Sequence, residues 1–154
     1  FHGPRHWELN KELWFFSAVA YDYKDHWKNL GVKIISPRSI PDNQFKIKIV
    51  VPKKYHTDLA SIHRAAWSFI APWDVARAAV VHDILYEALR TNKEALHSNT
   101  IIELRKNADN IMLEGMRAAE PKVPGTKIST VYWTLRLLGG MALKNSSYRE
   151  RHGW

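Results

Sequence analysis

The hydrophobic pattern of the chain changes its period about one third of the way along, and this change limits the possible folds. Apolar residues alternate with other residues between 44 and 51, so that one strand face carries Phe45, Ile47, Ile49 and Val51. Beyond residue 72, apolar residues recur every three or four positions, which is the period of a helix. The two periods predict an α+β fold, with a small antiparallel sheet from the N-terminal third packed on about three C-terminal helices.

The rest of the N-terminal third is less regular. The aromatic stretch 7–23 predicts one or two strands, and 31–35 predicts a short strand that ends at Ser36-Pro37. The polar stretch 25–29 between them reads as a loop.

Three helices are predicted in the remainder, each from a start or stop signal. The first runs from Pro72 to about Arg90 with Asp74 as its N-cap. The second begins with a capping box formed by Thr100 and Glu103 and ends before Pro121. The third covers roughly 129–143.

Length and composition favour one domain. The 154 residues are 45% hydrophobic, enough for a core, and we expect a single domain over 1–145 with a basic tail over 146–154. The chain has no cysteine, which excludes disulfides, a thiol nucleophile and cysteine-ligated zinc. Its longest apolar runs are far shorter than the ~20 residues of a spanning helix.

The charge favours an anionic partner. The net charge is +8, which suits an anionic membrane surface, an acidic protein or, less well, nucleic acid, for which no binding motif is present. A simple interpretation of Lys46, Lys48, Lys53 and Lys54 is a solvated strand face, with a lipid-binding patch as the alternative. Of the seven tryptophans, we assign Trp67 and Trp133 to the core and Trp154 to a tail contact.

Two stretches carry residues suited to chemistry. The first is 56–64 (HTDLASIHR), directly after the best strand, and the second is 80–86 (VVHDILY), inside the first predicted helix. His82 and Tyr86 lie four residues apart and therefore share one helix face, with Asp83 on an adjacent flank. If the next helix is an antiparallel neighbour, Asp109 can reach His82 or Tyr86.

These residues allow two interpretations. A carboxylate that is hydrogen-bonded to an imidazole fixes the tautomer of the ring and stabilises the protonated ring, as a general base requires. Asp83 and Asp58 offer oxygen ligands for calcium. The alternative is a polar network that only fixes helix packing. Arg64 and Arg77 are candidates for anion binding, or for structural pairs with the same two aspartates.

Three segments resemble a phage-associated domain family of unknown function. They are 57–61 (TDLAS), 77–86 (RAAVVHDILY) and 108–112 (ADNIM). The resemblance implies a small protein of tailed phages or prophages, found in the virion or in the host cytoplasm.

The pattern His82-Asp83-x-x-Tyr86, followed by Asp109 on a later helix, is also similar to the phospholipase A2 site. That resemblance implies that His82 activates water, that Asp83 binds calcium, and that Tyr86 and Asp109 hold the histidine. The glycine-rich calcium loop of that family is missing here, and only Asp58 in the 57–61 loop could replace it.

The function expected from these observations is a phage-encoded accessory or virion protein with a hydrolase-like His-Asp site. It would act on lipid esters at the host envelope. The alternative is a non-catalytic component of a phage particle that binds other phage structural proteins. The sequence leaves the oligomeric state open.

Overall fold

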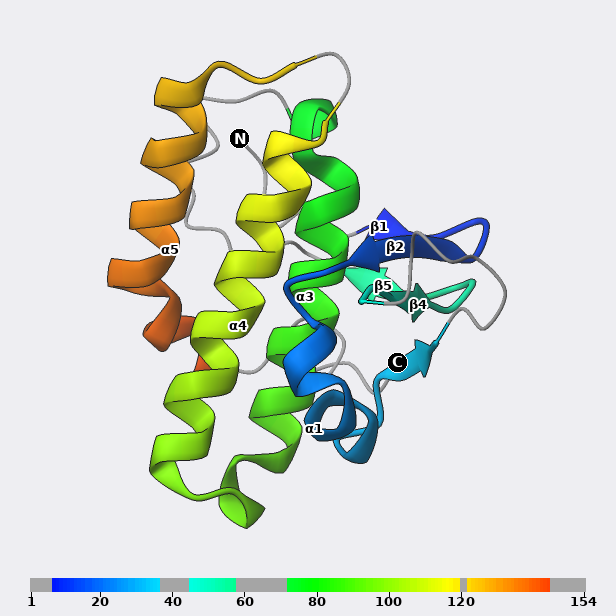
Figure 1. The fold of residues 1–154 in the computed structure, drawn as a ribbon, viewed down its shortest axis with the longest axis vertical. Helices are drawn as coiled ribbons and strands as arrows, with labels where there is room; N and C mark the ends of the chain where they lie inside the picture. Colours follow the sequence, from blue (N-terminus) through cyan, green and yellow to red (C-terminus); the bar gives the residue numbers. More distant parts are fainter. Residues whose placement is uncertain (1–6, 37–44, 58–71, 120–121, 145–154) are drawn as a thin grey trace.

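The computed structural model describes residues 7–36, 45–57, 72–119 and 122–144, and Figure 1 shows their arrangement. The predicted basic tail, Trp67, Trp154, Asp58 and Arg64 lie outside these ranges. The α+β prediction is confirmed: a small antiparallel sheet packs on three long C-terminal helices.

A three-stranded antiparallel sheet comes from the N-terminal half. Its strands are β2 (Leu13–Ser17), β4 (Ile47–Val51) and β3 (Lys33–Ile35), with β4 in the centre. A separate two-stranded pair joins β1 (Trp7–Glu8) to β5 (His56–Thr57). Phe45, placed in the central strand by the sequence pattern, lies before β4 and is exposed.

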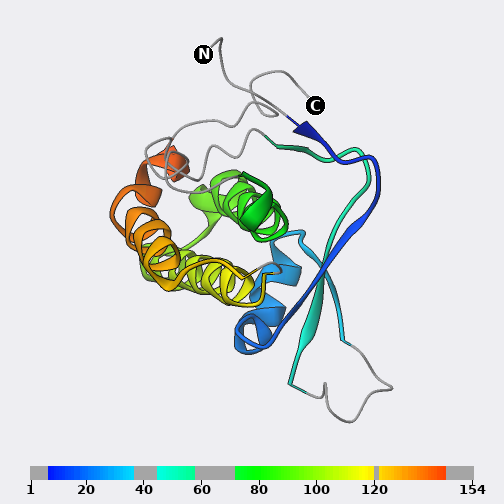
Figure 2. The ribbon, with the colours of Figure 1, turned by 90° about the horizontal axis from the view of Figure 1, so that it is seen from above.

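The pairing register gives the sheet two different faces. On the inner face Phe15 lies opposite Ile49, which in turn lies opposite Ile34, and the helices cover this side (Figure 2). On the other face, Phe16 pairs with Lys48 and Lys48 with Ile35. Paired residues of antiparallel strands project to the same side, so the second row belongs to the face turned away from the helices.

Residues 24–29 correct the sequence prediction. They form a short helix, α1 (Lys24–Asn29), after the 3-10 turn η1 (Tyr21–Tyr23), where a loop was expected. The reason is a tertiary contact, because the fully buried Trp27 donates from Nε1 to Asn107 Oδ1 at 2.8 Å. The polar composition of residues 24–29 could not indicate this long-range hydrogen bond.

The three long helices are α3 (Pro72–Asn92), α4 (Ser98–Arg117) and α5 (Gly125–Lys144), with the 3-10 turn η3 (Lys93–Ala95) between the first two. Their number was predicted correctly, and so was the opening of α3 at Pro72, but the starts of α4 and α5 were not. Helix α3 begins at Pro72, which suits a first helical position, so Asp74 lies inside the first turn instead of capping it. Helix α5 begins four residues earlier than expected.

The predicted capping box of α4 is wrong. The helix begins at Ser98, and His97 is its N-cap, with Nδ1 accepting from the Asn99 backbone N–H at 3.2 Å. Thr100 and Glu103 therefore lie inside the helix. Histidine is not among the preferred capping residues, which is why the sequence pattern pointed to Thr100.

One face of α4 fixes the N-terminal segment. Glu114 accepts hydrogen bonds from Ser17 Oγ and from the backbone N–H groups of Ala18 and Val19. Asn107 accepts from Trp27 and donates to the Val19 carbonyl. The turn after β2 is thus attached to α4 through side chains.

Trp133 corrects another expectation. It is 61% exposed on α5, whereas Val131 and Leu135 of the same helix are buried. The buried core lies instead between the inner sheet face and the three long helices. In the part of the chain that the structure describes, no helix has the length and apolar character needed to cross a bilayer.

Candidate functional site

Close packing of α3 on α4 brings the candidate residues together. Gly115 is buried on α4, and a Cβ there would lie 2.6 Å from the Cβ of Ala78 on α3. Only glycine allows the two helices to approach this closely. Helices α3 and α4 run antiparallel across a short connection. The residue six positions before Gly115 on α4, about 1.7 turns away, therefore meets the middle of α3.

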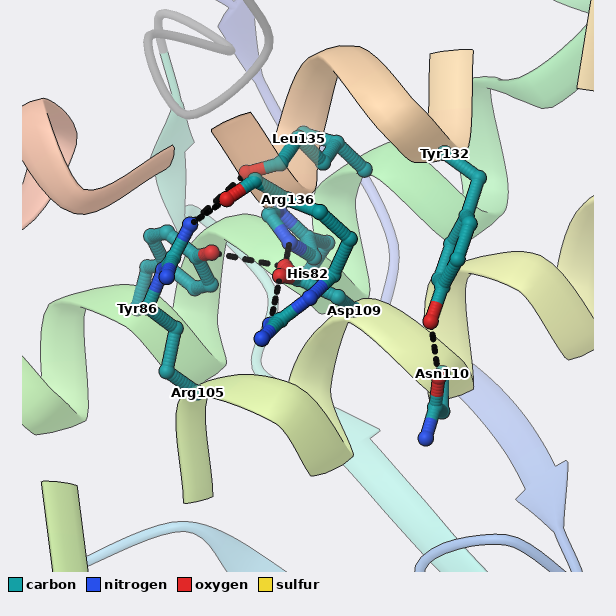
Figure 3. Close-up of polar contacts among 8 residues, drawn as sticks. All are labelled: His82, Tyr86, Arg105, Asp109, Asn110, Tyr132, Leu135 and Arg136. Atoms are coloured by element: carbon teal, nitrogen blue, oxygen red, sulfur yellow. Dashed lines mark hydrogen bonds and ion pairs between the residues drawn. The ribbon is translucent and has the colours of Figure 1, made fainter. Parts of the chain in front are cut away.

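That position is Asp109, and it is the centre of a polar network (Figure 3). His82 Nε2 lies 2.7 Å from Asp109 Oδ1, and the Tyr86 hydroxyl donates to the same oxygen at 2.6 Å. Arg136 Nη1 donates to Oδ2 at 2.7 Å. The sequence analysis expected Asp109 to reach His82 or Tyr86, and the carboxylate contacts both.

The network is deeply buried. The side chains of His82, Tyr86 and Asp109 have no exposed surface, and Arg136 is the most accessible member, with 20% of its side chain exposed. A buried carboxylate is tolerated only when it is paired and hydrogen-bonded, and three donors meet that requirement here.

The surroundings determine the protonation states. Burial alone would raise the pKa of the Asp109 carboxyl, but the hydrogen bond and charge of His82, with the bonds from Tyr86 and Arg136, hold it below its ordinary value of 3.8. Burial and then the nearby Asp109 carboxylate raise the pKa of the Tyr86 hydroxyl well above its ordinary value of 10.0. Asp109 is therefore a carboxylate and Tyr86 a neutral donor at neutral pH.

These states fix the tautomer of His82. A carboxylate can only accept hydrogen bonds, so the proton of the 2.7 Å contact belongs to His82 Nε2. A neutral His82 then carries its lone pair on Nδ1. This tautomer is the one that a histidine base oriented by an aspartate adopts.

Helix α5 supplies two arginine contacts that the sequence analysis missed. Arg136 binds Asp109, and Arg105 Nη2 of α4 donates to the backbone carbonyls of Leu135 and Arg136 at 2.9 and 2.7 Å. Arg136 is the one charged residue between Lys127 and Lys144. A single arginine inside the otherwise uncharged stretch 128–143 was the available signal for a buried acidic partner.

Gly139 lets α5 come close to the network. A Cβ at this position would lie 2.6 Å from the Tyr86 hydroxyl oxygen and 3.2 Å from Arg105 Nη2. The missing side chain leaves room for both groups, which explains a glycine in the middle of a helix where it lowers intrinsic stability.

Asp83 belongs to a second polar group on α3, next to β5. Its Oδ2 accepts a hydrogen bond from the Thr57 hydroxyl, and one turn further Glu87 accepts from the Tyr55 hydroxyl at 2.6 Å. The pKa of Tyr55 is raised by burial and then by these two carboxylates. The helix thus presents His82 to α4 and Asp83 to the strand.

The residues proposed for calcium are only partly within the described ranges. Calcium takes six to eight oxygen ligands, and Asp83 and Thr57 supply a carboxylate and one hydroxyl. Across 7–36, 45–57, 72–119 and 122–144, no group of three or more His, Asp or Glu side chains is placed to hold a metal. These residues alone do not make a calcium site. Of the two candidate anion-binding residues, Arg77 is exposed on α3.

Comparison with known proteins gives a family and no named relative. No curated protein and no solved structure matches the chain significantly. The family described as "protein of unknown function (DUF1353)" matches residues 33–134, about two thirds of the chain, including the whole of α3 and α4. The chain with the His82–Asp109 network is therefore a member of the DUF1353 family.

Proposed function

We propose that this protein is a hydrolase in which His82 is the general base, acting on acyl ester bonds of phospholipids at a bacterial envelope as a phage-encoded accessory or virion protein. One observation carries the proposal: Asp109 Oδ1 accepts from both His82 Nε2 and the Tyr86 hydroxyl. That arrangement orients the imidazole and holds it in the tautomer that carries its proton on Nε2, which is the tautomer a histidine base needs.

In the proposed reaction, His82 Nδ1 takes a proton from water while the water oxygen forms a bond to the ester carbonyl carbon. The imidazolium that results is stabilised by the Asp109 carboxylate through Nε2. Collapse of the tetrahedral intermediate breaks the bond to the alcohol oxygen, which receives the proton from Nδ1. The products are a fatty acid and a lysophospholipid, and His82 returns to its neutral form.

Arg136 and Tyr86 act through Asp109 as positioning residues. Arg136 holds Oδ2 and Tyr86 holds Oδ1, so the carboxylate cannot rotate away from the imidazole. In a low-dielectric interior such fixed groups need no reorganisation during the reaction.

In this proposal the calcium ligands would be Asp83 and Asp58, the residue that follows Thr57. A bound cation would polarise the ester carbonyl. The steps above depend on His82 and Asp109, and none of them is derived from the metal.

The burial of the network supports a second candidate. His82, Tyr86 and Asp109 have no exposed surface, so a substrate can reach Nδ1 only after some part of the structure moves. A sealed network suits a scaffold that fixes helix packing in a non-catalytic component of a phage particle.

Hydrolysis of phosphatidylglycerol vesicles, measured as released fatty acid, separates the two candidates. The variants are His82→Asn, which keeps an N–H donor near Asp109, and Tyr86→Phe, which keeps the ring and removes only the hydroxyl. The matched control is His97→Asn, because His97 is exposed and asparagine is a good N-cap for α4. Thermal melting shows which variants are folded.

The hydrolase proposal expects wild-type activity, a loss of about 10²–10⁴-fold in His82→Asn, a smaller loss in Tyr86→Phe and no loss in His97→Asn. Equal rates in wild type and folded His82→Asn would contradict it. Absence of hydrolysis, together with copurification at fixed stoichiometry with assembled particles, favours the scaffold.

A further inference from the structure

The outer sheet face carries large apolar side chains that the helices do not cover. We define this face as Trp14, Phe16, Lys33, Ile35 and Lys48, which the pairing places in two rows on the side away from the helices; Val50, paired with Trp14 and Lys33, is buried and is not counted in it. Trp14 is 49% exposed, Phe16 47% and Ile35 41%. Single exposed hydrophobic residues are normal, but three on one small face mark an interaction surface.

The same region is strongly basic. The segments 7–17, 33–35 and 45–57, which contain all five strands, hold six lysines and two glutamates. Their charge of +4 is half of the net charge of the whole chain. Lys33 and Lys48 lie on the outer sheet face itself, and Lys46 is exposed just before β4.

The lysines and the aromatic rings are in direct contact. Lys48 Nζ lies 3.7 Å from the centre of the Trp14 ring, and Trp14 Nε1 donates to Glu12 at 2.7 Å. Glu12 is an acidic residue hydrogen-bonded to this face. The interpretation of Lys48 as part of a simple solvated strand face is therefore incomplete, because β2 places aromatic side chains beside it.

We propose that the outer sheet face docks the protein on an anionic phospholipid bilayer. Trp and Phe favour the boundary between headgroups and acyl chains, and lysines at the same level attract anionic headgroups. A nucleic acid fits less well. Lys48 occupies one face of the Trp14 ring, and aliphatic Ile35 has no part in base stacking. Docking is separate from the hydrolase proposal, because it needs no ester bond and no contact with His82.

The test is sedimentation with vesicles of diether lipids, which have no acyl ester to hydrolyse. One set contains phosphatidylcholine alone, and the other contains phosphatidylglycerol as one quarter of the lipid. The apolar variant is Trp14→Ala/Phe16→Ala, and the basic variant is Lys33→Gln/Lys48→Gln. The matched control is Trp133→Ala/Leu137→Ala, which removes two apolar side chains from α5 that are more exposed than Trp14 and Phe16.

We expect the wild type and the α5 control to bind the anionic vesicles equally and to bind neutral vesicles weakly. The apolar variant should lose about tenfold or more in affinity. The basic variant should lose roughly 30-fold, about fivefold for each lysine. If the apolar variant has a lower melting temperature than the wild type, the basic variant, which keeps both aromatic side chains, still tests the proposal.

Four results would overturn the proposal. They are no binding of the wild type to anionic vesicles, equal binding of neutral and anionic vesicles, and the same loss of affinity in the α5 control as in the sheet variants. The fourth is a wild type that binds a DNA or RNA oligonucleotide, or dimerises, through this face in place of lipid.

Discussion

The approach of α5 to the buried network leads to a sharp prediction for Gly139→Ala. The new methyl group would lie 2.6 Å from the Tyr86 hydroxyl oxygen, far inside van der Waals contact. That oxygen cannot easily give way, because the ring is fully buried and the hydroxyl is bonded to Asp109 at 2.6 Å. Either α5 moves outward or the Tyr86–Asp109 bond lengthens.

Gly140→Ala is the matched control. It is the next residue of the same helix, and its new methyl group would lie 4.0 Å from its nearest neighbour, Arg105 Cζ. Both substitutions gain about 1 kcal/mol of helix propensity, which cancels when the variants are compared. Overpacking costs about 1–3 kcal/mol. We therefore expect Gly139→Ala to have a free energy of unfolding about 1–3 kcal/mol below that of Gly140→Ala.

Urea unfolding at pH 7 measures this difference. With a denaturant slope of about 2 kcal/mol per molar for a domain of this size, the two midpoints should differ by about 0.5–1.5 M. The control should unfold at or above the wild-type midpoint. Midpoints of the two variants within about 0.2 M of each other would refute the reasoning, because Gly139 would then have no role in the contact between α5 and Tyr86.

Three further predictions concern other contacts. Because its folded pKa lies below 3.8, Asp109 stabilises the fold fully above about pH 4. This contribution falls by up to about 1.4 kcal/mol per pH unit as the pH drops toward the folded pKa. Urea unfolding between pH 5 and pH 2.5 should show that Asp109→Asn lacks this part of the pH dependence, and equal slopes would contradict the assignment. Asn107→Ala removes the acceptor of the buried Trp27 N–H and should lower stability by about 1–3 kcal/mol, against a smaller loss in half-buried Asn110→Ala. If Asp83 binds calcium with a dissociation constant near 0.5 mM, 5 mM calcium should raise the melting temperature by about 3–5 °C and magnesium should not, and the same rise in Asp83→Asn would exclude that carboxylate as a ligand.

The predictable part of the site depended on helix geometry. The four-residue spacing of His82 and Tyr86 places both on one face in any α-helix. The short connection after α3 makes α4 an antiparallel neighbour, which brings Asp109 opposite them. Local rules therefore sufficed for three of the four members of the network.

The missed features depend on contacts between distant segments. Arg136 lies on the next helix, 27 residues after Asp109, and no local pattern shows which face of α5 turns inward. The polar stretch around Trp27 is helical, and the Trp27 indole is hydrogen-bonded to Asn107, 80 residues away. The aromatic Trp133 was assigned to the core on hydrophobicity alone, but α5 packs through Val131 and Leu135 and leaves it on the surface.

Helix α4 has a consequence for how this family can vary in length. Asn107 and Glu114 hold the N-terminal turn, while Arg105 and Asp109 engage α3 and α5, so two unrelated sets of partners alternate along a few turns. One inserted or deleted residue would rotate everything beyond it by about 100° and separate both sets from their partners. We expect insertions and deletions among relatives to be absent between residues 105 and 114, and to occur in the connections between elements instead.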